Sequence, residues 1–172
     1  MPADLGFAYC VSVPMRARLL ALAAAALVFL VPLQPSWATM NHSQQVLINS
    51  DFSNQDLRGV TFNLANLREA NLSGSDLEGA SLFGAKLDDA NLSNTNLRES
   101  TLDSAIFNGT DLTNAVLEDA FAFNTRFKNV TITGADFTNV PLRGDVLTTL
   151  CAAAEGTNPI TGRDTRDSLD CS

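Results

Sequence analysis

The chain has 172 residues and a formal net charge of −8, from eleven basic and nineteen acidic residues. Its acidic balance disfavours nucleic acid as a partner, because binding to phosphates depends on Lys and Arg. A single histidine excludes a zinc motif with two histidines, and no G-x-S-x-G motif for a nucleophilic serine occurs. The sequence therefore predicts neither an enzyme nor a cofactor or metal site.

Residues 1–38 have the composition of a cleaved export signal. The segment 15–18 supplies two basic residues, and 19–31 is an unbroken run of thirteen apolar residues. A polar exit follows, and it ends in the small-x-small pattern Ser36-Trp37-Ala38 that precedes a cleavage site. We expect cleavage after Ala38, which leaves an exported protein with no permanent membrane anchor.

The sequence leaves two alternatives open for this leader. The apolar run could instead be a membrane anchor, but it is shorter than the ~20 residues that a spanning helix needs, and Pro32 and Pro35 stop it. The chain could also start at Met15 rather than Met1, because Asp4 and Cys10 precede the basic residues, which is unusual in a signal peptide.

Removal of the leader leaves 134 residues, enough for one domain, with nine basic and eighteen acidic side chains and a net charge of −9. Two cysteines remain, Cys151 and Cys171. An even pair in an exported chain predicts a disulfide, which would stabilise the C-terminal segment by about 3 kcal/mol. The alternative is two free buried thiols.

The dominant feature of the sequence is a repeat of five residues. From position 47 to 147 every fifth residue has a large apolar side chain, except Ala122. Two residues earlier in each repeat, from Val60 to Val140, the residue is always Ala, Ser, Thr or Val. The most regular part of the apolar column is Leu67, Leu72, Leu77, Leu82, Leu87, Leu92, Leu97, Leu102, Phe107, Leu112 and Leu117.

A period of five fits neither a helix nor a flat strand. In a helix, five residues advance the side chain by about 140°, so the apolar residues would not form one stripe. In a strand, they would alternate between the two faces. All of them can be buried only if the chain turns a corner in each repeat, with the small and large apolar residues pointing inward. Such a chain coils on itself as a solenoid.

The outward positions support this interpretation. Asp or Asn often follows the small residue, and these types hydrogen-bond the local backbone in turns. The last place of the repeat often holds glycine, as at Gly59, Gly79 and Gly144, where a corner can require positive φ. We expect turn chemistry there and no metal site.

The length of one circuit is suggested by the charges. At a spacing of twenty residues, the outward side chains Arg58, Glu78, Arg98 and Glu118 alternate in sign, whereas a spacing of fifteen gives no such alternation. Four repeats per circuit are therefore favoured, which gives about five coils.

The repeat A(D/N)LXX resembles the pentapeptide-repeat family. The resemblance covers residues 46–146 and implies an all-β solenoid, a right-handed quadrilateral β-helix of about five coils. The C-terminal sequence "LCAAAEGTNPITGRDTRDSLDC" is similar to the C-terminal region of pentapeptide-repeat proteins of the thylakoid lumen. That similarity implies a cap of two short helices joined by a Cys151–Cys171 disulfide.

These observations divide the chain into four segments: an export signal at 1–38, a flexible or capping segment at 39–45, the β-helix at 46–146 and the helical cap at 147–172. Asp145 is suited to cap a helix that ends before Gly156, and Asn158-Pro159 predicts a turn. A cap is expected because the last coil of a solenoid otherwise exposes unpaired backbone groups.

An apolar patch is a candidate interaction site. Phe121 and Phe123 flank Ala122 on outward positions, and a twenty-residue circuit places Phe83 and Leu64 on the same side. A patch on a polar solenoid suggests a protein partner. The local alternatives, which we favour, are that one Phe swings inward to fill the space beside Ala122 or that the C-terminal helices cover the patch.

Two functional classes follow from the resemblance. The first is a non-enzymatic scaffold or interaction module of the thylakoid lumen, or of the periplasm, with an unidentified protein partner. The second is an acidic mimic of duplex DNA that binds a topoisomerase, which export and the interrupting residues Arg58, Arg68, Arg98 and Lys128 disfavour. The disulfide is expected to be a permanent staple, with a redox-sensitive clip as the alternative. The sequence does not indicate an oligomeric state.

Overall fold

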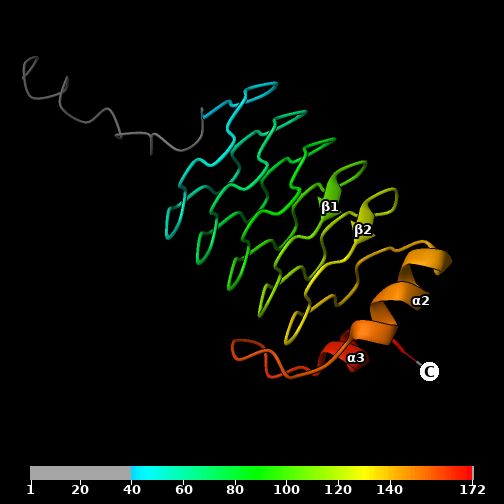
Figure 1. The fold of residues 1–172 in the computed structure, drawn as a ribbon. Coiled ribbons are helices and arrows are strands. Elements are labelled where there is room, and N and C mark those ends of the chain that lie inside the picture. Colours follow the sequence, from blue (N-terminus) through cyan, green and yellow to red (C-terminus); the bar gives the residue numbers. More distant parts are fainter. Residues whose placement is uncertain (1–39, 172) are drawn as a thin grey trace, which may run out of the picture. The chain divides into compact units, whose positions relative to one another are not determined.

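The computed structural model describes residues 40–171, so the predicted export signal lies outside the described residues. The described chain winds through a stack of similar coils and ends in two helices (Figure 1). Its regular elements are strand β1 (Ile106–Asn108), strand β2 (Arg126–Lys128), helix α2 (Gly144–Ala153) and helix α3 (Thr165–Ser168).

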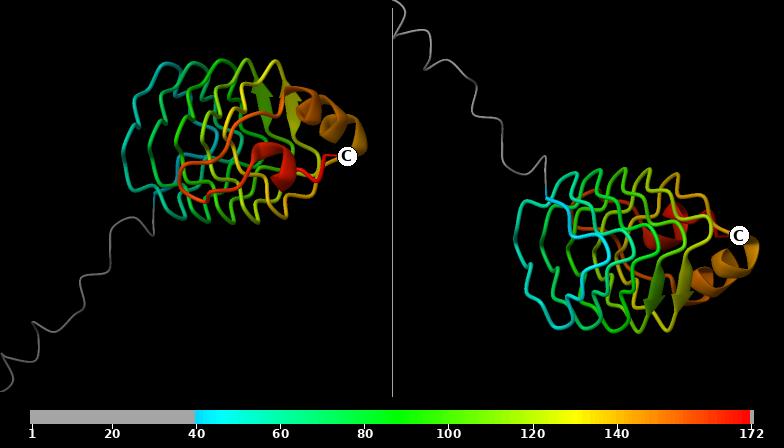
Figure 2. Two further views of the ribbon diagram at one scale, coloured as in Figure 1. Left: turned by 90° about the horizontal axis from the view of Figure 1, so that it is seen from below. Right: turned by 90° about the horizontal axis from the view of Figure 1, so that it is seen from above.

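Each coil contains twenty residues. Parallel bridges join residues twenty apart along the stack, from Asn41 with Thr61 to Val116 with Asp136. In the same register, β1 pairs with β2 and places Phe107 opposite Phe127. Four five-residue sides therefore make one circuit, as the alternating charges predicted, and successive coils lie directly above one another (Figure 2).

The corners explain why the apolar residue returns after five positions. At a typical corner the Val60 N–H donates to the Leu57 carbonyl at 3.1 Å, and Gly59 has a φ of 65°. This is the backbone of a turn whose third residue needs positive φ. Asn, Asp and other residues also adopt positive φ at equivalent places. Asn and Asp side chains elsewhere in the repeat support the turn, as where Asn71 Oδ1 accepts from the Ser73 N–H at 3.2 Å. Gly144 differs, because it begins α2.

The core is the apolar column predicted from the repeat. The eleven large apolar side chains at every fifth position from Leu67 to Leu117 are completely buried. The small residues form a second buried column, and its hydroxyls are satisfied by backbone carbonyls, as where Thr110 Oγ1 donates to the Leu87 oxygen at 2.7 Å. Small side chains are required there because they lie on the inner side of a tight corner.

The N-terminal boundary of the solenoid differs from the predicted one. Residues 40–45 belong to the first coil: the His42 N–H donates to the Thr61 carbonyl at 2.7 Å, and the His42 ring stacks on Phe62 at 5.2 Å between centroids. The imidazole thus takes the place that leucine occupies in later repeats. An apolar pattern misses it because histidine is counted as polar.

The C-terminal boundary also moves. Helix α2 begins at Gly144, inside the segment assigned to the β-helix, and ends at Ala153, before Gly156 as expected. Its N-cap is Arg143, without a side-chain capping bond, so Asp145 is not the cap. Asp145 lies in the first turn, where its carboxylate pairs with Arg143 at 3.2 Å.

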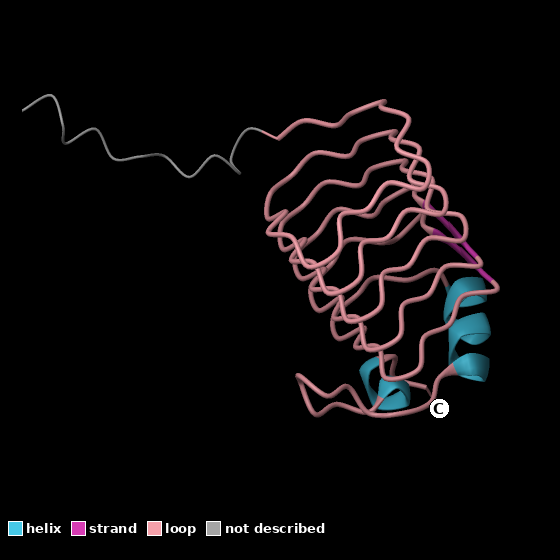
Figure 3. Ribbon diagram, turned by 60° about the vertical axis from the view of Figure 1, so that its left-hand side comes forward, coloured by secondary structure: helices cyan, strands magenta, loops and turns pink. Residues whose placement is uncertain are grey.

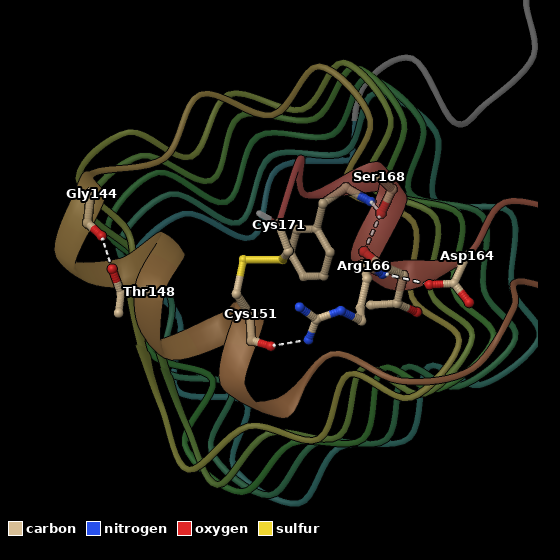
Figure 4. The surroundings of a disulfide bond; sticks show 9 residues. Gly144, Thr148, Cys151, Asp164, Arg166, Ser168 and Cys171 are labelled. Atoms are coloured by element: carbon tan, nitrogen blue, oxygen red, sulfur yellow. Dashed lines mark hydrogen bonds between the residues drawn. A yellow bond between two sulfur atoms is a disulfide. The ribbon is translucent and has the colours of Figure 1, made fainter.

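The cap is closed by a disulfide between Cys151 and Cys171, which joins α2 to the chain end after α3 (Figure 4). Arg166 Nη1 donates to the Cys151 carbonyl at 3.0 Å across the same junction. Leu150 and Leu169 are buried where the two helices meet the last coil. The cap therefore extends the apolar column at one end of the stack.

Candidate interaction surface

The four apolar residues of the predicted patch are exposed on one corner of the stack. The exposed fractions are 53% for Leu64, 43% for Phe83, 50% for Phe121 and 48% for Phe123. Their positions follow from the register, because the corners at 61–64, 81–84 and 121–124 stack on one another. No aromatic ring contact joins these side chains to each other or to another described ring.

The patch has two halves separated by a charge. Residue 103 occupies the coil between Phe83 and Phe123, and it is an aspartate. Leu64 leans over Gly84 in the neighbouring coil, since its Cδ2 atom fills the space that a Cβ there would take. One half therefore consists of Leu64 and Phe83, and the other of Phe121 and Phe123.

The favoured local explanation of this irregular repeat was wrong. Ala122 is completely buried, yet both flanking phenylalanines stay half exposed, so neither fills the core and the helices do not cover them. Phe121 cannot swing inward without breaking its bridge with Thr101. The small core residue leaves the phenyl rings outside because the outward positions are fixed by the ladder.

Asp103 also determines the backbone of this corner. Asn124 is not among the residues with positive φ, unlike residues at equivalent places in other coils. Its N–H and Nδ2 both donate to Asp103 Oδ1, at 3.0 and 3.1 Å. These contacts describe a turn whose central peptide is flipped toward the preceding coil, held there by a carboxylate.

A second wall carries the alternating charges. Arg98 Nε lies 3.1 Å from Glu118 Oε2 in the next coil, and Arg58 contacts both Asp56, at 2.6 Å, and Asp76, at 3.6 Å. The hydrogen bonds from Arg58 hold the pKa of Asp56 below its ordinary value. Exposed pairs of this kind contribute little to stability.

At the end of this wall, the C-terminal loop is attached by Arg163. Its Nη1 lies 2.8 Å from Glu118 Oε1 and 3.2 Å from Asp136 Oδ2. Burial of Asp136 opposes ionisation, but hydrogen bonds from Thr138 and the charge of Arg163 outweigh it, so its pKa lies below the ordinary value. Arg163 and Arg98 likewise lower the pKa of Glu118.

The structure also forms a basic cleft that the sequence analysis did not single out. It has a volume of about 450 Å³ and lies between β2 and the first turns of α2. Its lining residues are Thr125, Arg126, Phe127, Lys128, Arg143, Asp145, Val146 and Thr149. The sequence feature that could have predicted this cleft is Arg126-Phe127-Lys128, where two basic residues replace the usual turn residues.

Neither a metal centre nor a membrane span is found in residues 40–171. No three His, Cys, Asp or Glu side chains converge there as metal ligands. No helix within this range has the length and apolar character needed to cross a bilayer. The exposed features that remain are the divided apolar patch, the charged wall and the basic cleft.

Comparison with known proteins identifies the repeat. A family model described as pentapeptide repeats, eight copies, matches residues 46–82 and, a second time, residues 80–119. A pentapeptide repeat protein from the thylakoid lumen of Arabidopsis thaliana is 46% identical, and the alignment covers 76% of this chain and 91% of that one with a TM-score of 0.75. The chain belongs to the pentapeptide-repeat family. The predicted right-handed β-helix with its disulfide-linked cap is thereby confirmed.

Other solved pentapeptide-repeat structures are less similar. One from the cyanobacterium Cyanothece 51142 is 29% identical, covering 59% of this chain and 76% of that one, with a TM-score of 0.38. One from Nostoc PCC 7120 is 23% identical, covering 74% and 94%, with a TM-score of 0.39. Comparison with curated protein sequences gives no match.

Proposed function

We propose that this pentapeptide-repeat protein is an exported, non-enzymatic interaction module of the thylakoid lumen. The observation that carries the proposal is the 46% identity to a thylakoid-lumen pentapeptide repeat protein, over 91% of that chain. The leader-like sequence of residues 1–38 supports the same compartment, because a lumenal protein has to be exported. The paired cysteines also suit an oxidising environment.

The surface supports protein binding rather than catalysis. Leu64, Phe83, Phe121 and Phe123 stand on turns that are hydrogen-bonded to neighbouring coils, so a partner would meet side chains already held in place. Exposed aromatic rings of this kind are common anchors at protein interfaces. Asp103 separates the two halves, and its carboxylate already accepts hydrogen bonds from Asn124 and Ser104 within the chain.

Mimicry of duplex DNA has less support. The mature charge of −9 is compatible with it, but the acidic groups are distributed among arginines that pair with them. Arg58 and Arg98 each pair with a carboxylate of the next coil. These positive charges interrupt the continuous negative potential that a duplex presents. Export would also separate this protein from the topoisomerase that it would have to bind.

Localisation tests the proposal directly. The full-length chain would be expressed in a cyanobacterium, the cells separated into cytosol, membrane and lumen, and the intact mass of the protein measured. We expect a lumenal species that begins after Ala38 and has almost no absorbance at 280 nm, because Tyr9 and Trp37 are lost with the leader. An uncleaved cytosolic protein would contradict it.

The patch makes a separate prediction. Replacing Phe83 and Phe123 together by Ser should leave the melting temperature nearly unchanged, since both rings are about half exposed, and should remove partner crosslinks detected by mass spectrometry in isolated thylakoids. Ile160→Ser, at an apolar residue that is 63% exposed in the C-terminal loop, is the matched control and should keep the crosslinks. A large fall in melting temperature would instead assign the rings a packing role.

A further inference from the structure

The last coil leaves one corner without hydrogen-bond partners. At each of the other three corners the cap or the preceding coil supplies an acceptor for one of the two N–H groups: Asp103 Oδ1 for Asn124 N, the Glu155 carbonyl for Gly134 N, and Ser168 Oγ for Phe137 N, at 3.0, 2.8 and 3.0 Å. At the β2 corner, the N–H groups of Phe127 and Asn129 have no acceptor among residues 40–171. A further coil would supply them, but the chain has already entered α2.

This free edge faces the basic cleft. Strand β2 and helix α2 lie on the same side of the stack (Figure 3), and the cleft between them is lined by Thr125 to Lys128 of the strand. The Thr125 carbonyl, which would accept from a following coil, also has no donor in the described residues. The edge therefore offers two donors and one acceptor in the arrangement of a strand that lacks its neighbour.

The charges beside the edge that have no ion-pair partner among residues 40–171 are both positive. Arg126 and Lys128 are exposed on the outward side of β2, and neither forms an ion pair with a described residue. Arg143, the third base of the cleft, is neutralised by Asp145 at 3.2 Å. In the preceding coil, the equivalent positions are the uncharged Ile106 and Asn108. Two bases without counter-ions thus stand together on a protein that is otherwise acidic.

We propose that this edge binds an extended acidic peptide segment of a protein partner by strand addition. The two free N–H groups are two residues apart, and so are the two bases, which corresponds to about 6.6 Å along a strand. Alternate side chains of an extended peptide have the same spacing, so its carbonyls meet the N–H groups while its carboxylates meet Arg126 and Lys128. A single small anion would bind only one of the two N–H groups and one of the two bases.

The site goes beyond the proposed function, because it lies at a different corner from the apolar patch and specifies the chemistry of a ligand. The ligand has to be extended, because its backbone continues a ladder that ends at β2. It has to be acidic, because Phe127 is nearly buried and only the flanking bases are left to contact outward side chains.

The test uses the protein without its leader and a fluorescein-labelled octapeptide of alternating Asp and Val, with binding followed by fluorescence anisotropy. We expect saturable binding that weakens as salt is raised, since exposed charges are screened. The double variant Arg126→Ser, Lys128→Ser should lose about tenfold or more in affinity. The control Arg68→Ser, Lys86→Ser makes the same change in net charge on the same wall and should alter affinity by less than about twofold.

A second probe separates strand addition from simple charge attraction. The same peptide N-methylated at alternate residues keeps all its carboxylates but cannot donate to the Thr125 carbonyl or approach the edge closely. We expect it to bind about tenfold or more weakly. Equal binding of the methylated peptide, or an equal loss in the control variant, would overturn the proposal. Circular dichroism would verify that each variant keeps its fold, and the Phe83, Phe123 variant should bind the peptide normally.

Discussion

At the scale of single residues, position within the quintet decides the environment of a side chain. The large apolar residue and the small one preceding it by two point inward, and the others form the turn. Polarity matters less than place: Thr95 and Thr110 are buried in the small column because their hydroxyls reach core carbonyls, whereas Leu64 is 53% exposed because it occupies a turn position.

Leu92 allows this rule to be tested. It is completely buried in the middle of the column, so Leu92→Ala should lower the free energy of unfolding by about 2–5 kcal/mol, measured by urea denaturation. Leu64→Ala removes the same atoms from a turn position and should cost less than about 1 kcal/mol. Equal costs for the two variants would show that the quintet position does not determine burial.

At the scale of elements, the C-terminal cap is fixed by polar contacts as much as by its disulfide. Asn158 is buried, and its Nδ2 donates to the Gly134 carbonyl at 2.8 Å while its Oδ1 accepts from the Ile160 and Thr161 N–H groups. One side chain thus organises the loop and attaches it to the last coil. Arg163 performs the second attachment through Glu118 and Asp136.

This second attachment should be sensitive to acid. The pKa values of Asp136 and Glu118 are lowered in the folded state, so the stability they contribute is complete above their unfolded pKa values of about 4 and is lost as the pH falls through the lower folded values. We expect Asp136→Asn to lower the free energy of unfolding by about 1 kcal/mol at pH 7. The difference from the parent protein should shrink between pH 4 and pH 2.

Urea denaturation at several pH values measures this effect. Asp145→Asn is a suitable control, because that carboxylate is paired with an arginine but is 66% exposed, and its effect at pH 7 should stay below about 0.5 kcal/mol. A deficit for Asp136→Asn that stayed constant down to pH 2 would mean that the charge of this carboxylate does not hold the cap.

At the scale of the whole molecule, the stack is nearly one-dimensional. Each coil bonds only to the coils twenty residues before and after it, and β1 and β2 follow the same rule. One quintet can therefore take the place of another as long as the five-residue period is kept, although the outward side chains of the quintets differ. Within residues 40–171 the two ends of the stack are built differently: His42 stacks on Phe62 at one end, and α2 and α3 cover the other.

The phase rule predicts the outcome of two deletions. Removal of residues 91–95 joins Ala90 to Asn96 and preserves the order small, Asn, Leu, so the protein should still unfold in one cooperative thermal transition. Removal of residues 91–94 leaves Thr95 after Ala90 and delays Leu97 by one place. That variant should have a much lower melting temperature, by roughly 10 °C or more. Similar melting temperatures for the two would contradict a core fixed by the five-residue period.

The sequence by itself determined the inward column, the corners and the twenty-residue circuit, because a repeat states the same steric requirement many times. The pairing of Cys151 with Cys171 was predictable for a different reason, since they are the two cysteines that remain after the leader. The tertiary structure decided what happens where the repeat is broken. That Ala122 leaves both phenyl rings outside, that His42 completes the first coil and that β2 keeps an unpaired edge beside two bases all depend on contacts between coils. Such contacts join residues twenty or more positions apart and have no signature within a single quintet.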